Sequence, residues 1–226
     1  MPGHDLARRL AAEFVGTAFL LMAVVGSGVM AQRLSGGNDA LALLGNTLST
    51  GAALVVLISI FGPVSGAHFN PVVSLCFALR RDIAPGAALL YAAVQMLGAL
   101  AGVFAAHAMF AMPVLEVSAK LRDGPGQGMA EFIATFGLVL TILGALRHRA
   151  EAIPMLVGLY IIAAYWFTAS TSFANPAVTL ARAFTDSFSG IAPSSVPLFL
   201  VAQLAGALAA LGLSGWLFAP INTAQK

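Results

Sequence analysis

Residues 65–73 read Ser65-Gly66-Ala67-His68-Phe69-Asn70-Pro71-Val72-Val73, and residues 171–178 read Thr171-Ser172-Phe173-Ala174-Asn175-Pro176-Ala177-Val178. Each stretch contains an Asn-Pro step entered from a small, polar loop. Asn is a strong N-cap because its side-chain oxygen accepts hydrogen bonds from orphan backbone N–H groups. Pro suits the first helical position, where the missing N–H costs nothing. Each stretch therefore predicts the start of a helix, capped by Asn70-Pro71-Val72 in one case and by Asn175-Pro176-Ala177 in the other.

Both predicted helices are short. The helix-like runs after the caps extend only from Val72 to Leu79 and from Ala177 to Phe184, and the second contains Arg182. A helix needs about 20 apolar residues to span a bilayer, so neither run can do so.

The composition of the chain is that of a membrane protein. Of its 226 residues, 59% are hydrophobic and only 9% are charged, and the mean hydropathy is +0.91. Globular domains carry about 25% charged residues. We therefore expect an all-α integral membrane protein. The net charge of +2 gives no support for nucleic-acid binding. The single cysteine, Cys76, excludes an internal disulfide, and we expect it to serve in packing.

Six long apolar segments predict six membrane spans, near residues 9–31, 41–61, 86–110, 128–146, 154–170 and 196–218. Lys and Arg favour the cytoplasmic side of a membrane protein. The side that carries both termini holds seven such residues, against four on the other side: Arg8, Arg9, Arg80, Arg81, Arg147, Arg149 and Lys226, against Arg33, Lys120, Arg122 and Arg182. This difference predicts that both termini are cytoplasmic.

The chain also repeats itself. Residues 12–17 match residues 130–135, the two Asn-Pro steps match each other, and residues 94–102 resemble residues 202–209, in the same order along the chain. Each half holds three spans, an odd number, so the second half must be inverted relative to the first. We therefore expect one domain, residues 1–226, made of two inverted repeats at about 1–112 and 127–226. Inverted repeats place broken helices at the bilayer midplane, where a transport path can form.

The two loops predict a pore if they fold into the membrane from opposite faces. Asn70 and Asn175 then meet near the middle, and the positive ends of both short helices face the centre. Central donors and positive dipoles oppose a proton-conducting water chain and repel cations. Backbone carbonyls of the loops would offer acceptors along the path, namely those of Gly66, Ala67, His68, Phe69, Phe173 and Ala174, with Ser172 beside them.

These motifs together resemble the aquaporin and aquaglyceroporin (major intrinsic protein) family, in a bacterial type, over nearly the whole chain. The resemblance rests on the paired Asn-Pro boxes, the two Ala-Glu-Phe segments at 12–14 and 130–132, and the Gln-x-x-Gly-Ala segments. It implies six spans plus two re-entrant half-helices, and a homotetramer in which each subunit holds its own pore. It also implies a bacterial inner membrane protein with the lipid bilayer, water and small neutral solutes as partners, and neither enzyme activity, cofactor nor metal site.

Two carboxylates lie inside predicted spans, Glu13 and Glu131. A buried carboxylate must be paired or hydrogen-bonded. It could relay protons, or it could accept hydrogen bonds from the loop N–H groups and so hold each half-helix, which is the role the resemblance implies. We expect Gln95 and Gln203 to pack helices together. His68 has two interpretations, a proton-sensitive gate or a pore-lining residue that offers its carbonyl.

The resemblance also implies a four-residue selectivity filter outside the Asn boxes. Counting from the boxes assigns it to Thr50, Ala163, Ser172 and Val178. The last position is usually arginine, which narrows the path, donates hydrogen bonds and repels cations. Valine does none of these. The aromatic and histidine residues of water-selective members are also absent from the assigned set, so the filter is expected to be wide and half polar.

Arg182 lies four residues after Val178, one helical turn outward. It could stand at the outer mouth and supply some of the missing charge, or it could cap the half-helix or pair with Asp186. Tyr165 and Trp166, near the outer end of a span, fit an aromatic interface belt.

The predicted function is therefore a passive channel for small uncharged solutes and water that excludes ions and protons. Glycerol-like polyols, urea and trihydroxy metalloids such as arsenous acid fit such a filter. A water-selective channel is the alternative. A coupled transporter would have only Glu13 and Glu131 as ion sites, and a purely structural junction protein would lack permeability. No Ser/His, Asp/Asp or metal-spaced cluster within the spans supports an enzyme.

Overall fold

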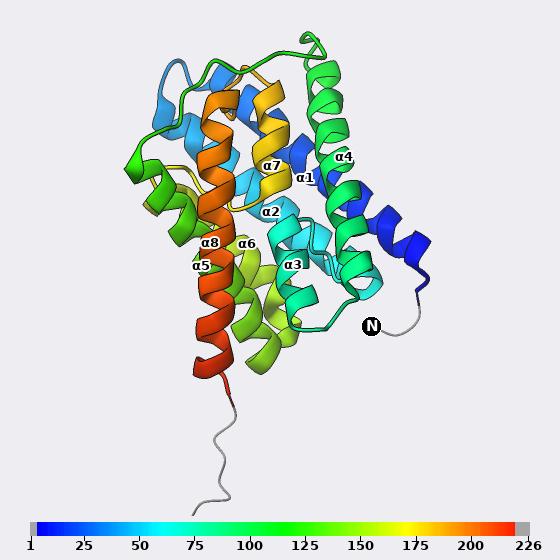
Figure 1. Cartoon of the computed structure of the whole chain (residues 1–226). Coiled ribbons are helices and arrows are strands. Elements are labelled where there is room, and N and C mark those ends of the chain that lie inside the picture. Colours follow the sequence, from blue (N-terminus) through cyan, green and yellow to red (C-terminus); the bar gives the residue numbers. More distant parts are fainter. Residues whose placement is uncertain (1–3, 220–226) are drawn as a thin grey trace, which may run out of the picture.

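The computed structural model describes residues 4–219, so Lys226 of the charge count lies outside the described residues. Within residues 4–219 all regular structure is helical, as Figure 1 shows. The α-helices are α1 (Leu6–Leu34), α2 (Asp39–Ser65), α3 (Pro71–Leu79), α4 (Pro85–Met109), α5 (Pro125–His148), α6 (Ile153–Phe167), α7 (Pro176–Ala181) and α8 (Val196–Leu217). Short 3-10 turns lie at Ala150–Ala152, Arg182–Phe184 and Pro193–Ser195.

Six of these helical segments are long and apolar enough to cross a membrane, namely α1, α2, α4, α5, α6 with its preceding turn, and α8 with its preceding turn. The six predicted spans are thereby confirmed. The two short helices are also confirmed, as α3 and α7. The second differs in detail, because its regular part ends at Ala181 and the chain continues as the 3-10 turn Arg182–Phe184.

The two halves of the chain run in opposite directions. In Figure 1, α1 and α4 run from the lower end of the molecule to the upper end, whereas α5 and α8 run from the upper end to the lower. α3 starts near the middle and descends, and α7 starts near the middle and ascends. The chain is therefore an inverted repeat, and both described chain ends lie at the lower end.

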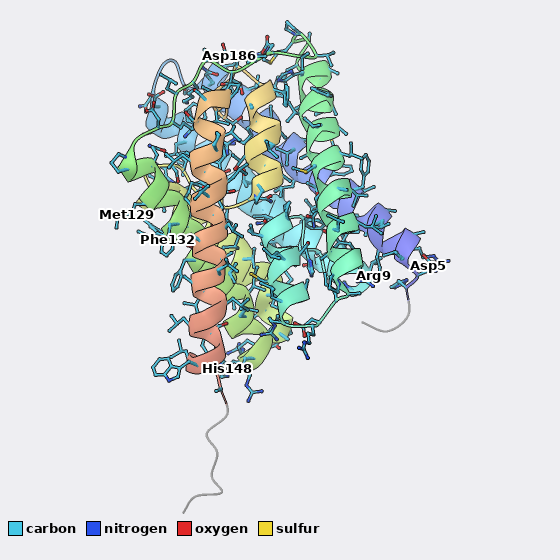
Figure 2. All side chains as sticks on the ribbon, in the orientation of Figure 1. Asp5, Arg9, Met129, Phe132, His148 and Asp186 are labelled. Atoms are coloured by element: carbon cyan, nitrogen blue, oxygen red, sulfur yellow. The ribbon has the colours of Figure 1, made fainter. Side chains whose placement is uncertain are left out.

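Side chains sort by environment as a bilayer requires. Large apolar residues are exposed along the long helices, among them Leu89 at 73%, Val201 at 69% and Met129 at 67%. Figure 2 shows Asp186 at the upper end of the molecule, and Asp5, Arg9 and His148 in its lower half. Monomeric soluble proteins rarely expose so much contiguous apolar surface. The chain is thus a multi-pass membrane protein.

Glycines lie at close helix crossings. A Cβ at Gly98 of α4 would lie 2.4 Å from the carbonyl oxygen of Phe14 in α1. A Cβ at Gly206 of α8 would lie 2.3 Å from the carbonyl oxygen of Phe132 in α5. Small residues let membrane helices approach each other in this way. The two Gln-x-x-Gly-Ala segments therefore serve equivalent crossings in the two halves.

Substituting these glycines should destabilise the fold. We expect Gly98→Ala and Gly206→Ala to lower the free energy of unfolding by about 1–3 kcal/mol, because the new methyl group meets backbone that cannot move aside. Gly86→Ala and Gly212→Ala, on the same two helices, are matched controls with nothing within 4 Å of the new Cβ. Thermal unfolding of detergent-solubilised protein, followed by size-exclusion chromatography, measures the effect. Equal melting temperatures for all four variants would contradict this packing role.

Candidate transport pore

The loops before α3 and α7 depart from helical backbone inside the membrane-spanning bundle. Residues 66–70 precede α3 and residues 168–175 precede α7. Several non-glycine residues adopt left-handed φ angles there, with Ala67 at 49°, Phe69 at 48°, Ser172 at 50° and Ala174 at 49°. Such conformations cost about 1–3 kcal/mol each and persist only when their surroundings hold them in place.

Glu13 holds the first loop. One carboxylate oxygen accepts from the backbone N–H of His68 at 2.9 Å and from the Ser65 hydroxyl at 2.6 Å. The other accepts from the backbone N–H of Phe69 at 2.7 Å and from the Gln95 amide at 2.8 Å. Glu13 is fully buried and does not line the cavity described below.

Glu131 holds the second loop in the same manner. Its two oxygens accept from the backbone N–H groups of Phe173 and Ala174, each at 2.8 Å. The Gln203 amide donates to it at 2.6 Å and to Thr179 at 2.8 Å, just as Gln95 also donates to Ser74. This geometry supports the anchoring role for both carboxylates over the proton relay. Gln95 and Gln203 belong to these networks, beyond the packing role expected of them.

The two Asn residues connect the loops to each other. The Asn70 side-chain oxygen accepts from the N–H of Val72, and its amide donates to the carbonyl of Ala174 at 2.7 Å. The Asn175 oxygen accepts from the N–H groups of Ala177 and Val178, and its amide donates to the carbonyl of Phe69 at 2.8 Å. The sequence predicted the caps but missed these reciprocal bonds. Each amide has a second N–H that remains available to a solute.

One cavity brings most of the predicted pore residues together. Its lining includes both Asn residues and all six loop residues whose carbonyls were expected along the path, from Gly66 to Phe69 with Phe173 and Ala174. It also includes three of the four predicted filter residues, Thr50, Ser172 and Val178. Apolar side chains of α1, α2, α5 and α6 complete the wall.

The assignment of Ala163 to the filter is wrong. Ala163 is exposed on the outside of the bundle, and α6 instead turns Val157, Ile161 and Tyr165 to the cavity. These residues are four apart and share one helix face, whereas Ala163 lies half a turn away. No motif fixes the rotation of this helix, and its large apolar residues lie on all faces, so the sequence carries no signal for it.

Tyr165 therefore has a different place from the one expected. It is only 3% exposed, and its hydroxyl donates to that of Thr50 at 3.4 Å. The interpretation of Tyr165 as part of an aromatic belt is wrong, whereas Trp166 is 49% exposed, as a belt residue would be. The Tyr165 ring therefore adds an aromatic residue to the cavity lining, beside Thr50.

His68 lines the cavity beside Asn70. Its Nδ1 is 3.0 Å from the Ser74 hydroxyl, and its ring packs against Phe77 and Tyr91. Its Nε2 is buried and has no hydrogen-bond partner within residues 4–219. The lining places His68 at the cavity, as both interpretations require, the gate and the residue that offers its carbonyl as an acceptor.

Arg182 also lines the cavity, at the upper end of α7. It is 1% exposed, and it does not pair with Asp186, whose carboxylate accepts from the N–H of Ala119 instead. Arg182 is also the C-cap residue of α7, so of its three expected roles only the pairing with Asp186 is contradicted.

The loop between α4 and α5 covers this end of the molecule. Ser118 donates its N–H to Ala183, and Ala192 donates to Lys120 across the connection from α7 to α8. Burial, together with the charges of Arg122 and Arg182, lowers the pKa of Lys120 to about 8. Burial likewise lowers the pKa of Arg122 to about 10. Lys120 therefore lies close enough to Arg122 and Arg182 for their positive charges to interact.

Comparison with known proteins agrees with this geometry. Residues 3–171 match the family model described as major intrinsic protein, which is more than half of the chain. The chain belongs to the major intrinsic protein family. It is 56% identical to "Aquaglyceroporin AqpS" of Rhizobium meliloti (strain 1021), over 97% of this chain and 94% of that relative. It is 28% identical to "Aquaporin NIP6-1" of Arabidopsis thaliana, over 93% of this chain and 69% of that one.

The solved structure of an aquaglyceroporin from Plasmodium falciparum shares the fold of this major intrinsic protein. The TM-score is 0.75 at 24% sequence identity, and the match covers 96% of this chain and 98% of that one. The six spans with two half-helices are therefore the fold of a known channel structure.

Substitutions of Glu131 separate the anchoring role from a proton relay. Glu131→Gln keeps one acceptor but turns an amide donor toward a backbone N–H, so we expect about 1–3 kcal/mol of destabilisation. Glu131→Ala leaves both loop N–H groups unsatisfied and should lower the yield of assembled protein further. Permeability per assembled Glu131→Gln molecule should equal wild type, because Glu131 is outside the cavity lining. Stopped-flow light scattering on vesicles with quantified protein measures this. A well-assembled Glu131→Gln variant without any flux would favour a coupled mechanism.

Proposed function

We propose that this chain is a passive transmembrane channel for small uncharged solutes and water that excludes ions and protons. The solutes are glycerol-like polyols, urea and trihydroxy metalloids such as arsenous acid. The observation that carries the proposal is the single cavity that both Asn70 and Asn175 line, with Val178 in place of a large charged residue beyond them. The likeness to a protein named as an aquaglyceroporin supports the same solute class.

The filter residues suit a solute that has one apolar side and several hydroxyls. Thr50, Tyr165 and Ser172 contribute hydroxyl groups, whereas Val178 contributes an apolar surface. A polyol that loses its hydration water can form hydrogen bonds with the hydroxyl groups of Thr50, Tyr165 and Ser172. Its C–H groups can lie against Val178. Selectivity in such pores follows from the diameter and from the donors and acceptors along the wall.

A water-selective channel is the second candidate, and Tyr165 is the observation that favours it. Its buried ring takes room at the level where small residues were expected. Water-selective and solute-conducting forms differ in one measurable quantity, the ratio of glycerol to water permeability.

Two other classes have less support. A coupled transporter would need an ion site in the path, and neither Glu13 nor Glu131 lines the cavity. The major intrinsic proteins are channels, so we propose no catalytic role for this chain.

We further propose that the channel is a homotetramer in a bacterial inner membrane, with both termini cytoplasmic. Of the four Lys and Arg residues at the upper end, Arg122 and Arg182 are buried. Fewer basic residues therefore remain exposed there than at the lower end, which agrees with the positive-inside rule if the upper end faces outward.

Val178→Arg tests the proposed filter. The new side chain adds bulk, five donors and a permanent charge, with carbonyls of residues 172–174 as acceptors. We expect glycerol and arsenous acid fluxes to fall at least about tenfold, equivalent to about 1.4 kcal/mol of added barrier, while water flux falls less. Stopped-flow light scattering of proteoliposomes measures all three.

Val178→Thr is the matched control, since it keeps the shape of the side chain without adding charge, and its flux ratios should remain close to wild type. An unchanged glycerol-to-water ratio in well-assembled Val178→Arg would show that Val178 does not line the constriction. Wild-type vesicles that pass water but no glycerol would favour the water-selective alternative.

A further inference from the structure

Arg182 is the only permanently charged side chain among the described residues that line the cavity. It follows α7 directly and lies one helical turn beyond Val178 on nearly the same face. Val178 and Arg182 therefore line successive levels of one path.

Among the described residues, no counter-ion pairs with the buried charge of Arg182. The side chain is 1% exposed, its Nε donates to the carbonyl of Ser189, and its guanidinium lies 3.4 Å from the centre of the Phe173 ring. Within residues 4–219 three ion pairs form, all at the exposed surface, and Arg182 belongs to none of them. A charge held in this way is costly, and in membrane proteins such groups mark conduction pathways.

One donor of Arg182 is also left without a protein partner. Its Nη1 is buried and makes no hydrogen bond within residues 4–219. A buried donor without an acceptor costs about 1–3 kcal/mol, and more when it is charged. Because Arg182 lines the cavity, water or a solute inside the cavity can supply the missing hydrogen-bond acceptor.

Arg122 provides an internal comparison. It lies over the same Phe173 ring, at 5.0 Å from the centre, and is also buried. Its Nε donates to the carbonyl of Gly190 and its Nη1 to that of Ser170. It does not line the cavity. Arg122 thus fastens the surrounding loops, whereas Arg182 keeps a charged donor free at the path.

We propose that Arg182 is the residue that excludes cations at the upper constriction of this channel, a role that Val178 cannot perform. The charge is displaced one turn outward from the level of Val178. The path can then stay wide enough for neutral solutes at Val178, while a cation must still pass the positive charge of Arg182. Fixed charge in a pore of low dielectric acts strongly on a passing ion, because little water screens it.

The test compares Arg182→Met, Arg182→Gln and Arg182→Lys with Arg122→Gln as the matched control, all in proteoliposomes. K⁺ leak is measured with a potential-sensitive dye, and glycerol and water fluxes are measured by stopped-flow in the same vesicles. We expect Arg182→Met and Arg182→Gln to raise K⁺ leak at least about tenfold over wild type. Arg182→Lys should keep K⁺ out because it keeps the charge, and Arg122→Gln should not leak.

Several results would overturn the proposal. One is a tight Arg182→Met channel that still conducts water, which would assign cation exclusion to the Asn boxes and helix dipoles alone. Another is an equal leak through Arg122→Gln, which would indicate loosened loops. Failure of both neutral Arg182 variants to assemble, while Arg122→Gln assembles, would assign Arg182 to folding instead.

The inference rests on the proposed function only in that a path exists. Wild-type glycerol flux tests the solute class, and K⁺ leak tests Arg182. If the channel passes water but no glycerol, the proposed solute class fails, and the K⁺ leak measurement still tests the role of Arg182.

Discussion

Hydrogen bonding of non-helical backbone inside the bilayer is the constraint on which this structure depends. Glu13 and Glu131 each accept from two consecutive loop N–H groups that lie outside any helix. Each unsatisfied group in hydrocarbon costs several kcal/mol, so the left-handed loop conformations are tenable only with these carboxylates in place. The half-helices can begin in the middle of the membrane because of them. An ionisable residue within a span thus has a structural use here.

The same loops set the chemistry of the path. Asn70 and Asn175 each cap one half-helix and donate to a carbonyl of the opposite loop, so the two repeats are locked together where the cavity passes. Beyond this level the wall is asymmetric. Val178 is an uncharged residue of the lining, and Arg182, one helical turn later, carries a buried charge. This arrangement is the basis of our proposal that solute size and charge are selected at two separate levels of the pore.

The sequence predicts the parts of the site that have local signals. The caps at Asn70 and Asn175 follow from side-chain chemistry, and the buried Glu13 and Glu131 from the cost of a carboxylate in a span. The rotation of α6 could not be predicted from the sequence. This helix is apolar on all faces, so it has no hydrophobic period that would favour Tyr165 over Ala163 as the pore-facing residue. The hydrogen-bond partner of Arg182 could not be predicted either. Ser189 lies in an irregular connection, and no sequence pattern indicates the conformation of that connection.

The most direct measurement is glycerol entry into vesicles that contain the wild-type protein, at several glycerol concentrations, with and without a proton gradient. A passive path through the Asn boxes predicts a permeability well above that of empty vesicles. It should not change with glycerol concentration or with the gradient. A permeability equal to that of empty vesicles, or one that saturates and follows the proton gradient, would contradict a passive channel for neutral polyols.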